Sequence, residues 1–207
     1  MAPPVFLFRN RSQHAFRIDG ERTFLRYPTV ADHGEWSRLR TASRSFLEPW
    51  EPSWSDDHEN RASFRYRVRR YDSDRDAGLA LPLFVCLKSN RRIIGGATLG
   101  SIRRGAAETC TLGYWMGEQY AGKGLMHDAL TGLLPHVFNT MRLHRIEAAC
   151  IPDNTRSQRL LEKIGFRREG YLNGYLKING AWRDHLLYAL IAEDWHSMRR
   201  KRSGPGG

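Results

Sequence analysis

Cysteines and long apolar runs are scarce in this sequence, and each scarcity excludes a class of protein. Only Cys86, Cys110 and Cys150 are present among 207 residues, and no two of them have the spacing of zinc ligands. We therefore expect no metal and no disulfide scaffold, but reduced core thiols in predicted strands of a cytoplasmic protein. The longest apolar run, residues 79–87, contains Pro82 and is too short to cross a membrane.

Negative charge is also scarce, because 22 Asp and Glu residues stand against 33 Lys and Arg residues and leave a net charge of +11. Such a field favours polyanionic partners, for example CoA phosphates, RNA or a protein bound to RNA, and it disfavours polyamines. The alternative is a basic surface that contacts only solvent. Residues 1–11 lack the layout of a signal peptide, and the basic run 199–202 precedes a glycine-rich end.

The length suits one domain with a substantial core. We predict an extension over residues 1–22, a domain over 23–196 and a basic, disordered tail over 197–207. Apolar residues with a period of two predict strands, and a period of 3.6 predicts helices. The predicted strands are 24–27, 83–87, 93–99, 109–116, 145–150, 166–178 and 182–190, and the predicted helices begin after Thr29 or cover about 55–71, 125–140 and 155–164.

The helix predicted over residues 55–71 is rich in arginine. Ser55, Asp56 and Asp57 are expected to form its N-terminal cap and first turn. Its arginines could form a basic face for a polyanion, or they could only be a solvated surface: Arg61, Arg65, Arg67, Arg69 and Arg70.

Residues 111–126 combine a predicted strand, a glycine-rich turn and the start of a helix. Such a turn leaves backbone N–H groups unpaired, and with Lys123 and the positive end of the helix dipole they suit a phosphate or pyrophosphate. From Gly117 the sequence runs G-x-x-x-x-G-K-G, but Gly124 stands where a Walker A loop needs Ser or Thr to hold Mg²⁺. From Gln119 it runs Q-x-x-G-x-G, in which glycines allow a positive φ and a close approach to the ligand.

A second segment covers residues 154–166. It begins with N-x-x-S, Asn154 to Ser157, and ends with E-K-I-G-F at residues 162–166. With Q-x-x-G-x-G it resembles the paired signatures of the GNAT N-acetyltransferase family. Other segments resemble the RimJ/RimL group of ribosomal-protein N-terminal acetyltransferases, above all its alanine-specific branch: 46–52, 122–126, 144–146, 169–171 and 182–185. The resemblance covers about residues 23–195.

The resemblance implies one α/β (α+β) domain whose mixed sheet has about six to seven mainly antiparallel strands, splayed at the cofactor site and flanked by helices. It also implies acetyl transfer from acetyl-CoA to a protein N-terminus, that of a ribosomal-protein alanine, by direct attack in a ternary complex of a monomer or homodimer. The residues implied in cofactor binding are Trp115, Met116, Gln119, Gly122, Lys123, Gly124, Leu125, Met126, Asn154 and Ser157.

Direct attack on a thioester requires a base for the amine, a donor for the oxyanion and an acid for the thiolate. An α-amine has a pKa of about 8, so a weak base or a water-relayed carboxylate suffices. The resemblance makes Glu108 the candidate base, with Tyr175, Tyr114 or a water chain as alternatives. A backbone N–H near Met116 is the candidate oxyanion donor, and Ser157 is the candidate acid or a positioning residue.

Aromatic residues in the resembling segments suggest an acceptor pocket for a short apolar first residue. Asp184 could bind the incoming ammonium, although ordinary packing could claim several of these side chains: Phe46, Trp50, Tyr171, Tyr175, Trp182 and Asp184. Cys150 has no base placed beside it in sequence, which favours a packed thiol over a covalent nucleophile.

Two other functions stay open at this point. One is a GNAT enzyme that acetylates a small amine, an antibiotic or a peptide. The other is a basic RNA- or ribosome-binding assembly factor on a GNAT scaffold, in which the Arg-rich helix and the tail bind RNA. The intact Q-x-x-G-x-G loop, Asn154 and Ser157 favour a working cofactor site.

Overall fold

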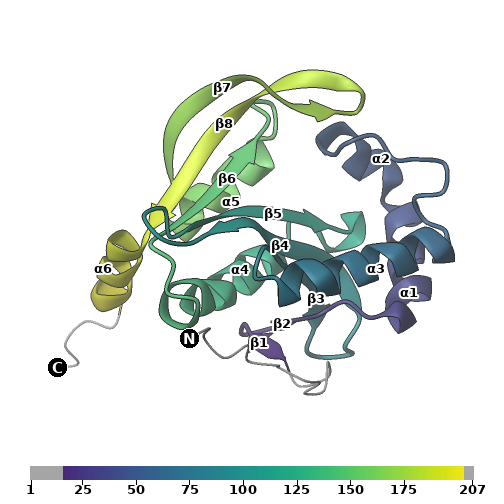
Figure 1. The fold of residues 1–207 in the computed structure, drawn as a ribbon, viewed down its shortest axis with the longest axis horizontal. Helices are drawn as coiled ribbons and strands as arrows, with labels where there is room; N and C mark the ends of the chain where they lie inside the picture. Colours follow the sequence, from purple (N-terminus) through teal and green to yellow (C-terminus); the bar gives the residue numbers. More distant parts are fainter. Residues whose placement is uncertain (1–15, 203–207) are drawn as a thin grey trace, which may run out of the picture.

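A computed structural model describes residues 16–202 as one eight-stranded sheet with helices on both faces (Figure 1). The spatial order is β1-β2-β3-β4-β5-β6-β8-β7, and only β5 and β6 pair in parallel. This confirms the mixed, mainly antiparallel α/β fold, with eight strands in place of six or seven. The strands are β1 Arg17–Asp19, β2 Thr23–Arg26, β3 Leu81–Leu87, β4 Ile93–Arg103, β5 Thr109–Met116, β6 Arg145–Cys150, β7 Arg167–Ile178 and β8 Ala181–Ile191.

The helices divide the core between the two faces of the sheet. On one face α1 (His33–Ala42) and α3 (Arg61–Asp76) bury Trp36, Leu39, Phe64 and Val68. On the other face α4 (Leu125–Pro135) and α5 (Thr155–Ile164) cover the larger core. The remaining helical segments are η1 Val30–Asp32, α2 Arg44–Leu47, η2 Glu48–Trp50, η3 Glu118–Tyr120, η4 His136–Thr140 and α6 Ala192–Arg202.

The apolar stripe predicted after Gly124 forms α4 and packs against the sheet, since Ala129, Leu130 and Leu133 are all at most 1% exposed. Pro135 has no N–H to donate, and the chain continues beyond it as the π-helical turn η4. The predicted hairpin of β7 and β8 and the buried free thiols of the three cysteines are confirmed.

Several boundaries differ from the sequence prediction. Helix α3 begins at Arg61 rather than near Ser55, because the side chain of Asn60 accepts the N–H of Ser63 at 2.7 Å and caps the helix there. It then continues to Asp76, through residues predicted as a loop. Strand β1 lies within residues 1–22, and α6 reaches Arg202, within the predicted tail. None of the helices between residues 16 and 202 is long and apolar enough to span a membrane.

Candidate active site

The loop between β5 and α4 has the backbone geometry that its glycines predicted. Gly122 and Gly124 both have a φ of +73°, a conformation that glycine adopts without strain. The N–H of Asp128 donates to Gly124 O, so Leu125 and Met126, which stand earlier in the first turn, have no helical acceptor for their N–H groups. Together with the exposed Lys123, this helix start offers donors and positive charge that fit a pyrophosphate.

The splayed gap lies beside this loop, between β5 and β6. Their parallel pairing covers only Thr109–Thr111 opposite Arg145–Glu147, after which the strands separate. Because the N–H of Gly117 donates to Ile94 O, the alternation of an antiparallel ladder turns the N–H of Met116 away from β4 and toward the gap. The gap therefore has an unpaired backbone donor at the position proposed for the oxyanion.

Two hydroxyl groups meet in the same gap. The oxygen atoms of Tyr114, on β5, and Ser157, in the first turn of α5, lie 2.6 Å apart. Asn154 Oδ1 accepts the N–H of Ser157 at 3.1 Å, so Asn154 is the N-cap of α5. The thiol of Cys150, at the end of β6, lies close enough to Ser157 for that hydroxyl to lower its pKa in part. Burial raises the pKa of Tyr114 and of Cys150, so both hold their protons at neutral pH.

The structure does not bring Glu108 to the gap. This residue precedes β5 at the end opposite the glycine loop, about 26 Å along the strand from Met116. Its carboxylate pairs with Arg104 at 3.3 Å, and its carbonyl accepts the N–H groups of His144 and Arg145. Glu108, with a φ of +39°, thus forms part of a turn at the end of β5 that is farther from the glycine loop.

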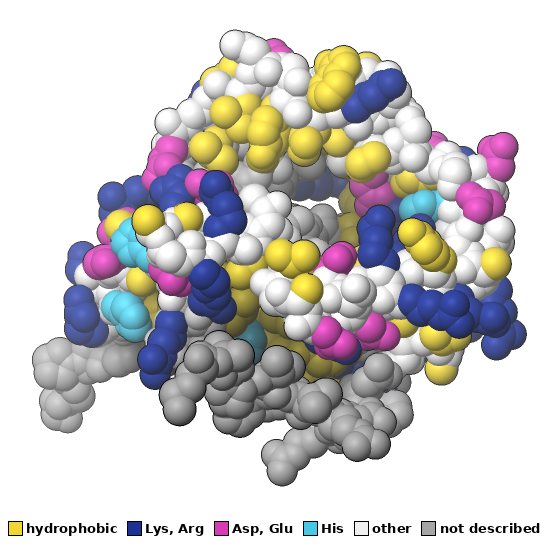
Figure 2. Space-filling model, viewed as in Figure 1, with side chains coloured by type: hydrophobic (Ala, Val, Ile, Leu, Met, Phe, Trp, Pro, Cys, Tyr) yellow, Lys and Arg dark blue, Asp and Glu magenta, His cyan; other side chains and the backbone are white. Residues whose placement is uncertain are grey.

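The β7–β8 hairpin arches over the sheet and closes a hollow against the α2 region (Figure 2). At its tip the N–H of Asn179 donates to Glu51 O at 2.9 Å. From the other side, Arg156 of α5 stacks over the ring of Phe46 in α2, at 5.1 Å. These contacts place Phe46 and the hairpin on the rim of one opening that leads toward the gap.

Several predicted acceptor residues lie on this hairpin with exposed rings. Tyr171 and Tyr175 are 49% and 43% exposed, and Trp182 is 68% exposed. Asp184 is already engaged, since it accepts the N–H of Gly174 and the hydroxyl of Tyr171, both at 2.7 Å. These two hydrogen bonds lower the pKa of Asp184, so it is a carboxylate that holds the bulge of β7. Across the hollow, Trp50 of η2 is 37% exposed.

Other predicted cofactor residues contribute unequally. Leu125 and Met126 bury their side chains in the core, so only their backbone is available to a ligand. Gln119 lies in a groove of about 530 Å³ between the loop and α1. Trp115 packs on the face of the sheet opposite Tyr114. Among residues 16–202 no group of His, Cys, Asp and Glu side chains is arranged to hold a metal ion.

The sequence prediction missed a buried cluster around Arg40. Its guanidinium lies between the rings of Trp54 and Trp115, at 4.2 and 4.7 Å, and forms a salt bridge with Glu51. This cluster fixes Trp115 beside the gap and joins α1 to the segment that the hairpin tip contacts. A buried arginine on an amphipathic helix gives no periodic signal, because arginine normally marks the solvent face.

Comparison with known proteins assigns the class. A family model described as "Acetyltransferase (GNAT) domain" matches residues 22–167, which include the glycine loop, the gap and both hydroxyl groups. The chain therefore belongs to the GNAT acetyltransferase family and is an acetyl-CoA-dependent N-acetyltransferase.

Its relatives include a particular kind of GNAT enzyme. The [Ribosomal protein uS5]-alanine N-acetyltransferase of Escherichia coli is 35% identical over 86% of this chain and 92% of its own. The solved structure of Mycobacterium smegmatis RimJ in complex with CoA-disulfide superposes with a TM-score of 0.83, at 34% identity over 91% of this chain and 95% of that one. The ribosomal-protein-S5-alanine acetyltransferase of Vibrio fischeri gives a TM-score of 0.80, at 32% identity over 87% and 98%.

Proposed function

We propose that this protein acetylates the α-amine of the N-terminal alanine of ribosomal protein uS5, in the cytoplasm. The observation that carries the proposal is the Tyr114–Ser157 hydroxyl pair in the gap, beside the outward N–H of Met116 and next to the glycine loop. The named activities of the E. coli and V. fischeri relatives support the acceptor, since this chain covers nearly their full lengths.

Acetyl-CoA supplies the acetyl thioester when it is bound. The backbone N–H groups of residues 122–126 and the side chain of Lys123 bind its pyrophosphate. The carboxamide NH₂ of Asn154, which the helix cap does not use, binds the part of acetyl-CoA that lies along the gap. Met116 N–H donates to the carbonyl oxygen as negative charge develops there. Ser157 holds the proton for the departing sulfur at Oγ, and Tyr114, kept protonated by burial, fixes that hydroxyl by a hydrogen bond.

The acceptor enters through the hollow below the hairpin. Its short apolar side chain packs against the aromatic rim of Phe46, Trp50, Tyr171, Tyr175 and Trp182, and the Asp184 carboxylate attracts its ammonium. Because the pKa of an α-amine is about 8, about a tenth of it is neutral at pH 7, and water in the hollow can accept the proton. No carboxylate base in the gap is required.

The test is mass spectrometry of three peptides that share the uS5 N-terminal sequence and begin with Ala, Ser or Met. With acetyl-CoA, the Ala peptide should gain one acetyl group fastest, and a spermidine control should gain none. Calorimetric titration of acetyl-CoA into the wild type and Gly122→Ala checks the cofactor site, since alanine is strained at this φ. Rapid acetylation of the small amine with no peptide modified would refute the proposed acceptor.

A second role, contact with RNA, is supported by one face of α3. Arg61, Arg65 and Arg69 repeat every four residues and are exposed beside Tyr66, which is 70% exposed. Arg67 does not belong to this face, because it stacks on Trp36. An exposed arginine row with an adjacent aromatic ring suits an RNA backbone and its bases.

Salt dependence tests this second role. Binding of a ribosomal RNA fragment to the wild type should weaken steeply with salt. Arg61→Glu/Arg65→Glu/Arg69→Glu should lower the magnitude of the slope of log K against log salt by about 3, because three phosphate contacts are lost. Arg103→Glu/Arg159→Glu/Arg168→Glu, at exposed positions outside α3 and the basic tail, is the charge-matched control. Equal slopes for the wild type and the α3 variant would refute a specific role for this face.

A further inference from the structure

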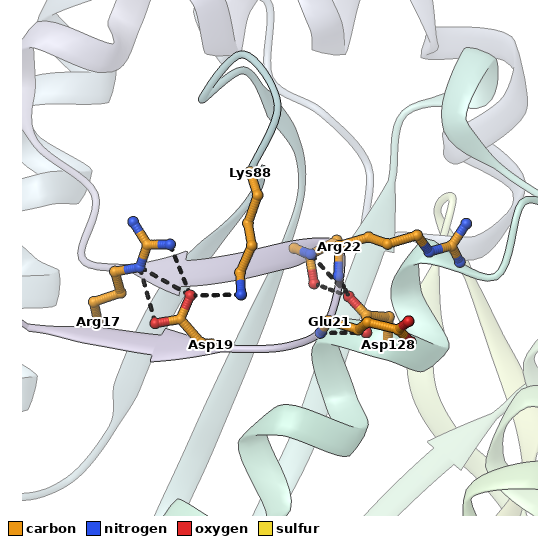
Figure 3. A network of polar contacts seen from close by, with 7 residues as sticks. Arg17, Asp19, Glu21, Arg22, Lys88 and Asp128 are labelled. Atoms are coloured by element: carbon orange, nitrogen blue, oxygen red, sulfur yellow. Dashed lines mark hydrogen bonds and ion pairs between the residues drawn. The ribbon is translucent and has the colours of Figure 1, made fainter.

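The turn between β1 and β2 is tied to the first helical turn of α4 by a single carboxylate. Asp128 accepts the backbone N–H groups of Glu21, Arg22 and Thr23 at 2.7, 3.0 and 2.8 Å. It also accepts the hydroxyl of Thr23 at 2.7 Å (Figure 3). Four hydrogen bonds to one side chain define the position of this turn although most of it is exposed.

Two glycines allow the turn to lie directly on α4. A Cβ at Gly20 would stand 2.7 Å from Asp128 Oδ2, and a Cβ at Gly132 would stand 2.7 Å from Asp19 O. A larger residue at position 132 would require a backbone shift, and one at position 20 would displace the Asp128 carboxylate from its hydrogen bonds. The close approach and the hydrogen bonds together show that the turn is built to occupy this place.

The consequence of this docking is the position of Arg22. Its Nη2 donates to the carbonyl of Lys123 at 3.1 Å, so its guanidinium flanks the glycine loop. Arg17, on the same hairpin, is neutralised by Asp19 at 2.7 Å, whereas Arg22 has no carboxylate partner among the described residues and extends away from that pair (Figure 3). Arg22 and Lys123 therefore leave two uncompensated cations beside the loop.

We propose that Arg22 recognises the 3′-phosphate of CoA and lets the enzyme discriminate CoA from its dephosphorylated form. This inference rests on the proposed cofactor site. The guanidinium lies on the carbonyl side of Lys123, while the loop N–H groups that suit the pyrophosphate are separate donors. The anion of CoA left for Arg22 is the phosphate on the adjoining ribose. One of the five N–H donors of a guanidinium bonds to Lys123 O, and the others stay available for a phosphate.

The test compares two ligands on three proteins. Acetyl-CoA and acetyl-3′-dephospho-CoA are titrated calorimetrically into the wild type, Arg22→Met and the hairpin control Arg17→Met. Arg22→Met should bind acetyl-CoA about tenfold more weakly, the loss expected for one charge-assisted hydrogen bond, and should bind the dephospho ligand as the wild type does. Arg17→Met should keep the wild-type preference. In turnover, Arg22→Met should raise the KM for acetyl-CoA at unchanged kcat, because Arg22 bonds to the loop and to neither hydroxyl group in the gap.

Two results would overturn the inference while leaving the cofactor site intact. Equal weakening of both ligands in Arg22→Met would assign Arg22 to the pyrophosphate or to the shape of the loop. Unchanged affinity for both ligands would show that Arg22 does not contact CoA. Failure of the wild type to bind either ligand would instead refute the cofactor site, so the two failures are distinguishable.

Discussion

At the scale of single residues, the chemistry of the gap depends on how Ser157 is held. Its N–H donates to Asn154 Oδ1, and its hydroxyl oxygen lies 2.6 Å from that of Tyr114. The hydrogen bond with Tyr114 restricts the rotation of this hydroxyl. The arrangement suits a proton donor whose position must be defined, and burial keeps Tyr114 from becoming a base.

Ser157→Ala should therefore lower kcat by about a hundredfold, the size expected for loss of a positioned acid, with the KM for acetyl-CoA nearly unchanged. Tyr114→Phe keeps the ring and removes only the hydroxyl, so its effect should be smaller. Steady-state kinetics with the Ala peptide measures both. A normal kcat in Ser157→Ala would show that water protonates the sulfur.

Glu108→Gln should retain the activity of the wild type within about twofold, because the residue lies about 26 Å from the loop end of β5. Loss of the ion pair with Arg104 is a surface effect of small size. The same kinetic assay measures it. A decrease of kcat by more than tenfold would mean that this carboxylate reaches the acceptor in a way the fold does not show.

At the scale of elements, the glycine loop and the acceptor side are joined through α1. The hydroxyl of Ser43, which is 1% exposed at the end of α1, accepts the N–H of Glu118 in η3 at 3.0 Å. A Cβ on Gly117 would meet Leu39 Cδ1 at 2.4 Å, so α1 packs directly on the loop. Helix α2 and Phe46 follow Ser43 at once, so a shift of α1 would reach both binding regions.

Ser43→Ala should destabilise the fold by about 1–3 kcal/mol and raise the KM for acetyl-CoA, because it leaves the N–H of Glu118 without its acceptor. The exposed Ser45→Ala on α2 is the matched control. Urea unfolding and acetyl-CoA titration check the two effects. Identical behaviour of both variants would show that α1 does not support the loop.

At the scale of the whole molecule, stability in acid depends on a histidine in the layer of α1 and α3. His58 is half-buried there, its ring stacks on Trp54 with centroids 4.8 Å apart, and its Nδ1 lies 3.2 Å from Arg67. Burial, and then the charge of Arg67, lowers the pKa of His58 from 6.5 to about 4. The unfolded chain therefore binds a proton at His58 in a pH range where the native protein does not.

The contribution of His58 to the free energy of unfolding should therefore be fully present above pH 6.5, and it should be lost as the pH falls from 6.5 toward 4. His58→Phe keeps a ring on Trp54 and removes the titrating group, so its urea midpoint should fall less between pH 7 and pH 5. The two pH slopes, rather than the absolute midpoints, are compared. Parallel slopes would show that His58 does not couple protonation to unfolding.

The local pattern was sufficient where the signal lies within a few consecutive residues. The strand 145–150, the helix 155–164 with its Asn154 cap, and the positive φ of Gly122 and Gly124 follow from period, capping and glycine chemistry. The helix near Ser55 was misplaced, because Ser55, Asp57 and Asn60 are all good caps and the hydrogen bond of Asn60 with Ser63 decides among them.

By itself the sequence determined the mixed fold, the glycine loop and the family, since these are written in short motifs and in apolar periodicity. Only the tertiary structure decided which distant side chains meet. It brought Tyr114 to Ser157 across 43 residues and set Arg22 beside Lys123 across 101 residues. The physical reason is that strand pairing and close helix packing set these distances, and the pattern of residues within one segment does not specify which distant segment it contacts.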